Sequence, residues 1–269
     1  MQGLLLSLFL SLAFCHLSFA DQTFSYDLHL SYISGDPSKI MVVAHGMGGN
    51  YTIAQSIKAS GKVPDTLVSF NFPDYDSINR VMTIDEVSYG TINELLPLLY
   101  VIKKSVIDDN YKGVNLYGFS AGGGAIINAL AVLNADRFDT DLKKIGINQK
   151  EKKEILLAIQ KGLIILDTPL KSIQEIIDFR GTSQDLEILA KRYRENDMEP
   201  IDAIKYLKGL TLRILVHFQN PDEILSNRDD RLFFERLKMY NPNGETRLIM
   251  GNDNGHIVPH PSLWDAYSN

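Results

Sequence analysis

Short apolar runs alternate with longer amphipathic segments along most of the chain. The apolar runs, which predict β-strands, lie at 26–32, 40–45, 66–71, 114–117, 162–167, 211–218 and 246–250. The segments with helical periodicity lie at 86–107, 121–134, 150–161, 185–196, 200–208 and 229–239. All the strands but the first are nearly continuous in apolar residues, which is typical of a parallel sheet covered by helices. The alternation predicts an α/β fold, with a mostly parallel twisted sheet and helices on both faces.

The segment 168–210 is too long for a simple connection between two strands of such a sheet. It is rich in helical pattern and follows the carboxyl end of a strand, the edge at which ligands bind in open α/β sheets. We therefore expect a small helical insert over this edge. The insert is interpreted as a lid, with plain packing onto the core as the alternative. No linker interrupts the chain after residue 20, so 21–269 is expected to be one domain.

The N-terminus carries the pattern of a signal peptide over 1–20. An apolar run at 3–15 is followed by Ser18 and Ala20, the small residues expected at the −3 and −1 positions of a cleavage site. We therefore expect a secreted or periplasmic protein cleaved after Ala20. The alternatives are a lipid anchor at Cys15 and a buried N-terminal helix. No later segment has the roughly 18 continuous apolar residues of a membrane span, so none is expected in the mature chain.

Processing at this site predicts that protein recovered from its native host begins at Asp21. N-terminal sequencing or intact-mass measurement checks this. A start at Met1, or at an acylated Cys15, would contradict it.

Charge and cysteine content narrow the chemistry. The formal net charge is −6 and the sequence has no long basic run, so no nucleic-acid partner is expected. Cys15 is the only cysteine, and cleavage would remove it. That excludes disulfides, a thiol nucleophile and a cysteine-ligated metal from the mature chain. Neither a cofactor nor a metal ion is predicted.

The segment Gly118-Phe119-Ser120-Ala121-Gly122 directly follows the strand 114–117 and leads into a helical pattern. A G-x-S-x-G segment at a strand–turn–helix junction holds its serine in a strained backbone, so that the hydroxyl projects above the sheet. The residues two before and two after, Gly118 and Gly122, must be very small in so tight a turn. The helix dipole also favours negative charge beside the turn. The pattern indicates a nucleophilic serine.

With this motif and the strand order, the chain resembles an α/β-hydrolase-fold serine hydrolase of the esterase and lipase kind, over about residues 25–265. A second motif, His45-Gly46-Met47-Gly48-Gly49, ends the strand 40–45. In the family such a loop supplies one backbone N–H of the oxyanion hole, and the residue after the nucleophile supplies the other. The resemblance therefore implies Met47 and Ala121 as these donors. His45 is expected to hold the loop by hydrogen bonds.

The resemblance also implies the two partners of Ser120. His256, in a Gly-His turn after the last strand, stands where the family has its base, and Asp222 follows the strand 211–218 where the family has its acid. The alternatives that stay open for the acid are Asp167, Glu223, Asp229 and Asp230, and those for the base are His260 and His217. Asp229 and Asp230 are interpreted as caps of the helix 229–239.

The function implied is hydrolysis of a carboxylic ester or thioester through an acyl-serine intermediate. The expected partner is a small-molecule ester or acyl substrate. A serine peptidase on the same fold is one alternative, because amides pass through a similar oxyanion. A protein that keeps the fold and only binds is the other.

Overall fold

The computed structural model of the chain describes residues 28–72, 88–252, 255–256 and 260–268. The predicted signal peptide, with Cys15 and the cleavage site after Ala20, lies outside these residues. Among the helices in the described ranges, none combines the length and the apolar character needed to cross a membrane.

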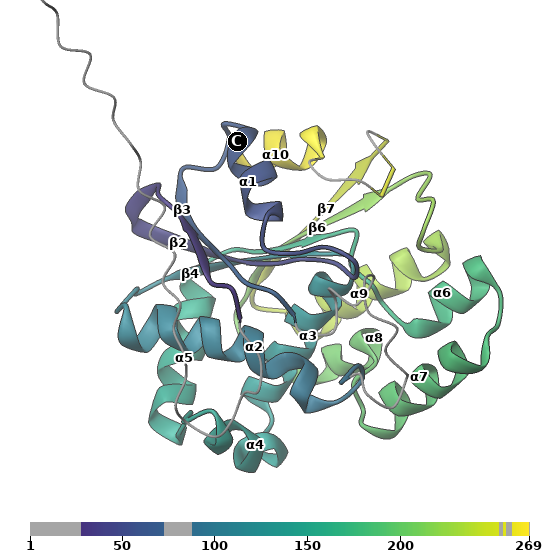
Figure 1. The fold of residues 1–269 in the computed structure, drawn as a ribbon, viewed down its shortest axis with the longest axis horizontal. Coiled ribbons are helices and arrows are strands. Elements are labelled where there is room, and N and C mark those ends of the chain that lie inside the picture. The colour runs from purple at the N-terminus through teal and green to yellow at the C-terminus, as the bar shows by residue number, and fades with distance from the viewer. Residues whose placement is uncertain (1–27, 73–87, 253–254, 257–259, 269) are drawn as a thin grey trace, which may run out of the picture.

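A seven-stranded sheet lies at the centre of the molecule, in the order β1-β3-β2-β4-β5-β6-β7 (Figure 1). The strands are β1 (Ser31–Ile33), β2 (Asp36–Ala44), β3 (Asp65–Ser69), β4 (Val114–Phe119), β5 (Ile164–Asp167), β6 (Arg213–Gln219) and β7 (Glu245–Gly251). Only the β1–β3 pair is antiparallel, and the other neighbours are parallel. The mostly parallel sheet predicted from the sequence is confirmed.

The first strand differs from its prediction at 26–32. Within the described residues it begins only at Ser31, because His29 has a φ of 42°, a left-handed conformation that a β-strand does not accommodate. The part before residue 28 lies outside the described residues.

Helices cover both faces of the sheet. They are α1 (Ile53–Ala59), α2 (Ile92–Lys103), α3 (Ala121–Asn134), α4 (Asp139–Lys144), α5 (Gln149–Lys161), α6 (Ile173–Arg180), α7 (Gln184–Glu195), α8 (Pro200–Ala203), α9 (Asp230–Tyr240) and α10 (Pro261–Ser268). Short π and 3-10 segments extend this set at Lys104–Asp108, Asp136–Phe138, Ile204–Leu207 and Asn227–Asp229.

The alternation along β2 shows how the two faces are filled. Met41 and Val43 point into a smaller core with α1 and α10, whereas Ile40, Val42 and Ala44 point into a larger core with α2 and α3. Successive side chains of a strand alternate between faces, so a strand covered on both sides must be apolar at every position. Figure 1 shows α1 and α10 together on one side of the sheet.

The insert 168–210 forms α6, α7 and α8, which lie at one side of the molecule next to α9 (Figure 1). Tyr193 of α7 donates to the buried carboxylate of Glu94 on α2 at 3.0 Å, and Asn196 donates to the carbonyl of Gly90 at 2.9 Å. Leu207 is fully buried in the larger core. These contacts attach the insert to the start of α2, and its role as a lid stays a prediction.

A buried lysine also joins the insert to α9. The Lys171 ammonium lies 2.6 Å from Glu175 and 2.7 Å from Asp230, and its side chain is only 2% exposed. The expectation that Asp229 and Asp230 cap α9 is wrong: Asp229 makes no capping hydrogen bond through its side chain, and Asp230 pairs with Lys171. A buried ammonium must be paired, and the buried Asp230 serves as a partner of Lys171.

Glu199, which precedes α8, gives this insert a pH-dependent stability. Burial raises the pKa of Glu199 from its ordinary 4.5 to about 7, although the backbone N–H of Ile173 donates to it. Between these two values the folded chain keeps a proton that the unfolded chain has released, so the free energy of unfolding falls as the pH rises from about 4.5 to about 7. Above that window the contribution is constant.

Glu199→Gln is therefore expected to raise the melting temperature at pH 8 and to leave it nearly unchanged at pH 4. The effect on the free energy of unfolding at pH 8 should be on the order of 1–3 kcal/mol. Thermal unfolding from pH 4 to 8 checks this, with Glu195→Gln as the control because that side chain is 64% exposed. Equal effects of Glu199→Gln at pH 4 and pH 8 would contradict the prediction.

Candidate active site

Ser120 lies at the junction of β4 and α3, in the turn predicted from the sequence. Its backbone has φ 53° and ψ −121°, a region that non-glycine residues rarely adopt and that persists only where surrounding contacts impose it. The contacts are hydrogen bonds on both sides: the Ser120 N–H donates to the Asp167 carbonyl at 3.0 Å, and the Ser120 carbonyl accepts from Leu170 N–H at 2.9 Å. The first turn after β5 therefore holds the strained turn after β4.

Close backbone packing explains the small residues around Ser120. A Cβ at Gly122 would lie 2.3 Å from the Ala44 carbonyl oxygen, and one at Gly118 would lie 2.6 Å from the Gly122 carbonyl oxygen. A Cβ at Gly46 would lie 2.9 Å from that of Ser120. The loop after β2 and the turn after β4 thus touch without side chains between them.

These two loops meet where the strand order reverses, since β2 has β3 on one side and β4 on the other. Such switch points are where open α/β sheets bind ligands. The buried His45 fixes the β2 loop, because its Nδ1 donates to the Gly46 carbonyl at 2.8 Å and its Nε2 accepts from Phe72 N–H at 3.0 Å.

Both residues implied as oxyanion donors adjoin this contact. Met47 follows Gly46 and is 46% exposed. Ala121 is the first residue of α3, where backbone N–H groups have no partner within the helix. Both residues therefore lie next to Ser120 or to the loop that touches it, and their role as oxyanion donors stays a prediction.

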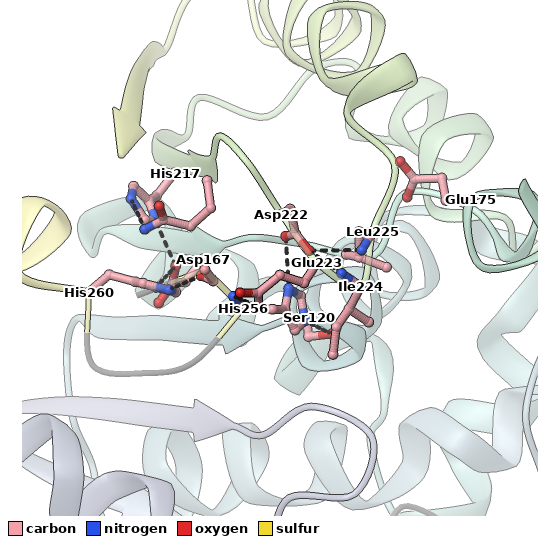
Figure 2. Close-up of polar contacts among 12 residues, drawn as sticks. Ser120, Asp167, Glu175, His217, Asp222, Glu223, Ile224, Leu225, His256 and His260 are labelled. Carbon is pink, nitrogen blue, oxygen red and sulfur yellow. Dashed lines mark hydrogen bonds and ion pairs between the residues drawn. The ribbon is translucent and has the colours of Figure 1, made fainter. Parts of the chain in front are cut away.

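His256 connects Ser120 to Asp222 (Figure 2). Its Nε2 lies 2.9 Å from Ser120 Oγ, and its Nδ1 lies 2.8 Å from Asp222 Oδ2. A carboxylate only accepts, so Nδ1 carries the proton and Nε2 is left to accept from the serine hydroxyl. This is the tautomer in which an imidazole can remove the proton of a nucleophilic serine.

The turn after β6 holds the Asp222 carboxylate in place. Its Oδ1 accepts from Ile224 N–H and Leu225 N–H, each at 2.8 Å. Burial alone would raise the pKa of Asp222, but the hydrogen bond and charge of His256, together with these two N–H groups, hold it below its ordinary value. Asp222 is therefore ionised at neutral pH.

The alternative acid lies in a different cluster. Asp167 Oδ1 accepts from His217 Nδ1 at 2.7 Å and from His260 Nδ1 at 2.8 Å, and Oδ2 accepts from the Tyr117 hydroxyl at 2.7 Å. The structure therefore brings the alternative base candidates, His217 and His260, to Asp167. Figure 2 shows this group beside the line from Ser120 to Asp222, with Glu175 apart from both.

The Asp167 cluster is fully buried, and the Asp167 carboxylate in it is ionised. Burial alone would raise the pKa of Asp167, but the hydrogen bonds and charges of His217 and His260 hold it well below its ordinary range. Burial and the neighbouring Asp167 raise the pKa of Tyr117 well above its ordinary value, so the phenol is a neutral donor. The sequence analysis named Asp167, His217 and His260 singly and missed Tyr117, and nothing local in the sequence shows that the four residues meet.

Asp167, His217 and His260 also offer ligand atoms within 4.8 Å of one another, a set that could hold a metal ion. Both histidine Nδ1 atoms, however, lie at hydrogen-bond distance from the same carboxylate oxygen, 2.7 and 2.8 Å. Zinc ligands instead surround the ion at about 2.0–2.2 Å. The arrangement fits three groups that share protons.

Several solved structures share this fold. An acylaminoacyl peptidase from Pyrococcus horikoshii matches 93% of the chain with a TM-score of 0.59 and 15% identity. Est1E from Butyrivibrio proteoclasticus, determined with bound ferulic acid, matches 92% with a TM-score of 0.59 and 15% identity. A carboxylesterase from Lactobacillus plantarum WCFS1 matches 91%, again with a TM-score of 0.59 and 15% identity. The chain has the α/β-hydrolase fold.

The share of each relative that is covered differs. The chain spans 39% of the peptidase but 95% of Est1E and 89% of the carboxylesterase. No protein-family model and no curated protein matches the sequence.

Proposed function

We propose that this chain is a serine hydrolase that cleaves a carboxylic ester or thioester through an acyl-serine intermediate. The observation that carries the proposal is the line of hydrogen bonds from Ser120 Oγ through His256 to Asp222, at 2.9 and 2.8 Å. It starts from a serine held in a strained turn. Esterases and a peptidase among the structures of the same fold agree with hydrolase chemistry.

In the proposed reaction Ser120 Oγ attacks the carbonyl carbon while His256 Nε2 takes the hydroxyl proton. The backbone N–H groups of Met47 and Ala121 stabilise the oxyanion that forms. His256 then gives the proton to the leaving oxygen or sulfur, and the acyl group stays on Ser120. Water, activated by the same imidazole, releases the acid. Asp222 stays ionised and stabilises the imidazolium.

A serine peptidase is the second candidate, because one of the similar structures is an acylaminoacyl peptidase. Esters and amides differ in their leaving groups, so a matched pair of substrates separates the two activities. Serine peptidases also hydrolyse activated esters, so the amide member of the pair decides. We expect turnover of a p-nitrophenyl ester and no measurable turnover of the p-nitroanilide with the same acyl group. Turnover of the anilide by the wild-type chain but not by Ser120→Ala would assign the chain to the peptidases.

A fluorophosphonate probe tests whether the chain is an enzyme at all, since only an activated serine reacts with it. We expect labelling of Ser120, located by peptide mass spectrometry, and no labelling of His256→Ala. A wild-type chain that stays unlabelled would instead support a binding protein. A series of model esters with increasing acyl length would then define the substrate and test whether the insert 168–210 acts as a lid.

A further inference from the structure

The peptide bond between Gly255 and His256 is held at both of its polar groups. Its carbonyl oxygen, on Gly255, accepts from His260 Nε2 at 2.9 Å, and its N–H, on His256, donates to Glu223 Oε2 at 3.4 Å. Glu223 comes from the turn after β6, and His260 directly precedes α10. Figure 2 shows both residues beside the turn that carries His256.

Glu223 also packs directly against this turn. Gly255 has a φ of 61°, and a Cβ there would lie 2.5 Å from Glu223 Oε2. A glycine in the left-handed region therefore lets the carboxylate reach the N–H of the next residue. The Glu223 carboxylate therefore occupies the space that a side chain at residue 255 would fill.

His260 is held as an imidazolium by what surrounds it. Its Nδ1 faces Asp167 Oδ1, and its Nε2 faces the Gly255 carbonyl oxygen. A carbonyl oxygen can only accept a hydrogen bond, and the oxygens of the ionised Asp167 carboxylate can also only accept. Each ring nitrogen must therefore carry a proton. His217 differs, because its Nε2 lies 3.2 Å from the Ser262 hydroxyl, which can donate to it. The cluster thus pairs one buried carboxylate with one buried cation.

Asp167 links this cation to the nucleophile as well. Its backbone carbonyl accepts from Ser120 N–H at 3.0 Å, while its carboxylate binds His260, which in turn binds the carbonyl before His256. The nucleophile and the base are therefore both tied to the end of β5.

We propose that His260 and Glu223 are positioning residues that clamp the Gly255–His256 peptide and so set the distance between His256 Nε2 and Ser120 Oγ. The proposal rests on the proposed function. A clamp of this kind matters because a misplacement of about 1 Å between reacting groups can cost on the order of 100-fold in rate.

Glu223→Ala tests the clamp in a side chain that is exposed, so the chain should still fold. We expect kcat for a model ester to fall by about 10- to 100-fold, with KM changed by less than about threefold. Glu223→Gln keeps an acceptor oxygen and should restore kcat to within about threefold of wild type. Glu235→Ala is the matched control, because Glu235 is also an exposed glutamate but lies on α9. An unchanged kcat in Glu223→Ala would overturn the proposal.

His260→Leu removes the other half of the clamp and should lower kcat in the same way. In a His256→Ala background, neither Glu223→Ala nor His260→Leu should lower the residual activity by more than about twofold, because a positioning residue acts only through the group that it positions. A further tenfold loss in that background would show a general structural role and overturn the proposal. If His260→Leu does not fold, the Glu223 pair decides.

The ring nitrogens of the histidines give a readout that needs no turnover. In ¹⁵N NMR spectra of the wild-type chain at pH 8, both His260 nitrogens should be protonated, and Glu223→Ala should shift the His256 signals while Glu223→Gln should not. A neutral His260, or His256 signals unmoved by Glu223→Ala, would overturn the clamp. If the chain neither reacts with a fluorophosphonate nor hydrolyses esters, the proposed function is wrong. The ¹⁵N spectra would still show whether Glu223 and His260 hold the Gly255–His256 peptide.

Discussion

Ser120→Ala and His256→Ala are each expected to lower kcat by about 10⁵- to 10⁶-fold, because the hydroxyl and the imidazole act as one unit. Without Ser120 Oγ there is no group to carry the acyl chain, and without His256 the 2.9 Å contact that removes the serine proton is lost. The double variant should be little worse than either single one. Steady-state turnover of a model ester, corrected for any wild-type carry-over, measures all three.

Folding should survive these changes. Alanine keeps the Cβ of Ser120, and both backbone hydrogen bonds remain: residue 120 still donates its N–H to the Asp167 carbonyl, and its carbonyl still accepts from Leu170 N–H. Ser38→Ala provides a matched control, because this exposed serine lies near the start of β2, at the opposite end of the strand from the loop beside Ser120, and it should retain wild-type kcat. If either site variant kept most of its kcat with the fold intact, the nucleophile and base would have to be sought elsewhere.

Asp222→Asn is expected to lower kcat by about 10³- to 10⁴-fold. Asp222 Oδ1 already accepts from two backbone N–H groups, so an asparagine must keep its carbonyl oxygen there. Its amide nitrogen then faces His256 Nδ1 and donates to it, which moves the imidazole proton to Nε2. That tautomer cannot accept from Ser120, and the imidazolium loses its counter-charge.

Asp167→Asn supplies the comparison, because its carboxyl is also buried beside histidines. It should act mainly on stability: removing the charge leaves the His260 imidazolium unpaired, which costs about 3–5 kcal/mol in a buried pair. In folded protein its kcat should stay at least tenfold above that of Asp222→Asn. Measuring kcat and the melting temperature of both variants at pH 7–8 ranks them. A larger kcat loss for Asp167→Asn would move the acid to the end of β5.

Much of the fold follows from the sequence because its signals are local. The helix predicted at 121–134 is α3 to the residue, and every strand after the first lies within a few residues of its prediction. The sequence pattern does not predict the short helices α1, α4 and α10. Each has only six to eight residues, which is too few for a clear 3.6-residue period. Asp229 and Asp230 were placed wrongly as caps because the partner of Asp230, Lys171, lies about sixty positions away in the sequence.

The site also has one part that follows from local sequence signals and another that does not. The Gly-x-Ser-x-Gly turn is readable because Gly118 and Gly122 are demanded by backbone contacts within a few residues or with the neighbouring strand. Ser120, His256 and Asp222, chosen from their places after successive strands, are brought together by the sheet. The cluster of Tyr117, Asp167, His217 and His260 could not be read in advance, because its members come from three strands and a segment after the last one, and none stands in a motif.

The attachment of both Ser120 and the His256 turn to Asp167 has a consequence for thermal motion. When β5 shifts against its neighbours, Ser120 follows the backbone of Asp167, and the His256 turn follows the Asp167 carboxylate through His260. The displacements of Ser120 and His256 are therefore correlated. Fluctuations of the surrounding loops then change the Ser120–His256 separation less than they change the distances from this pair to those loops. Heating should therefore erode substrate binding at lower temperatures than it erodes reaction of Ser120 with a small fluorophosphonate.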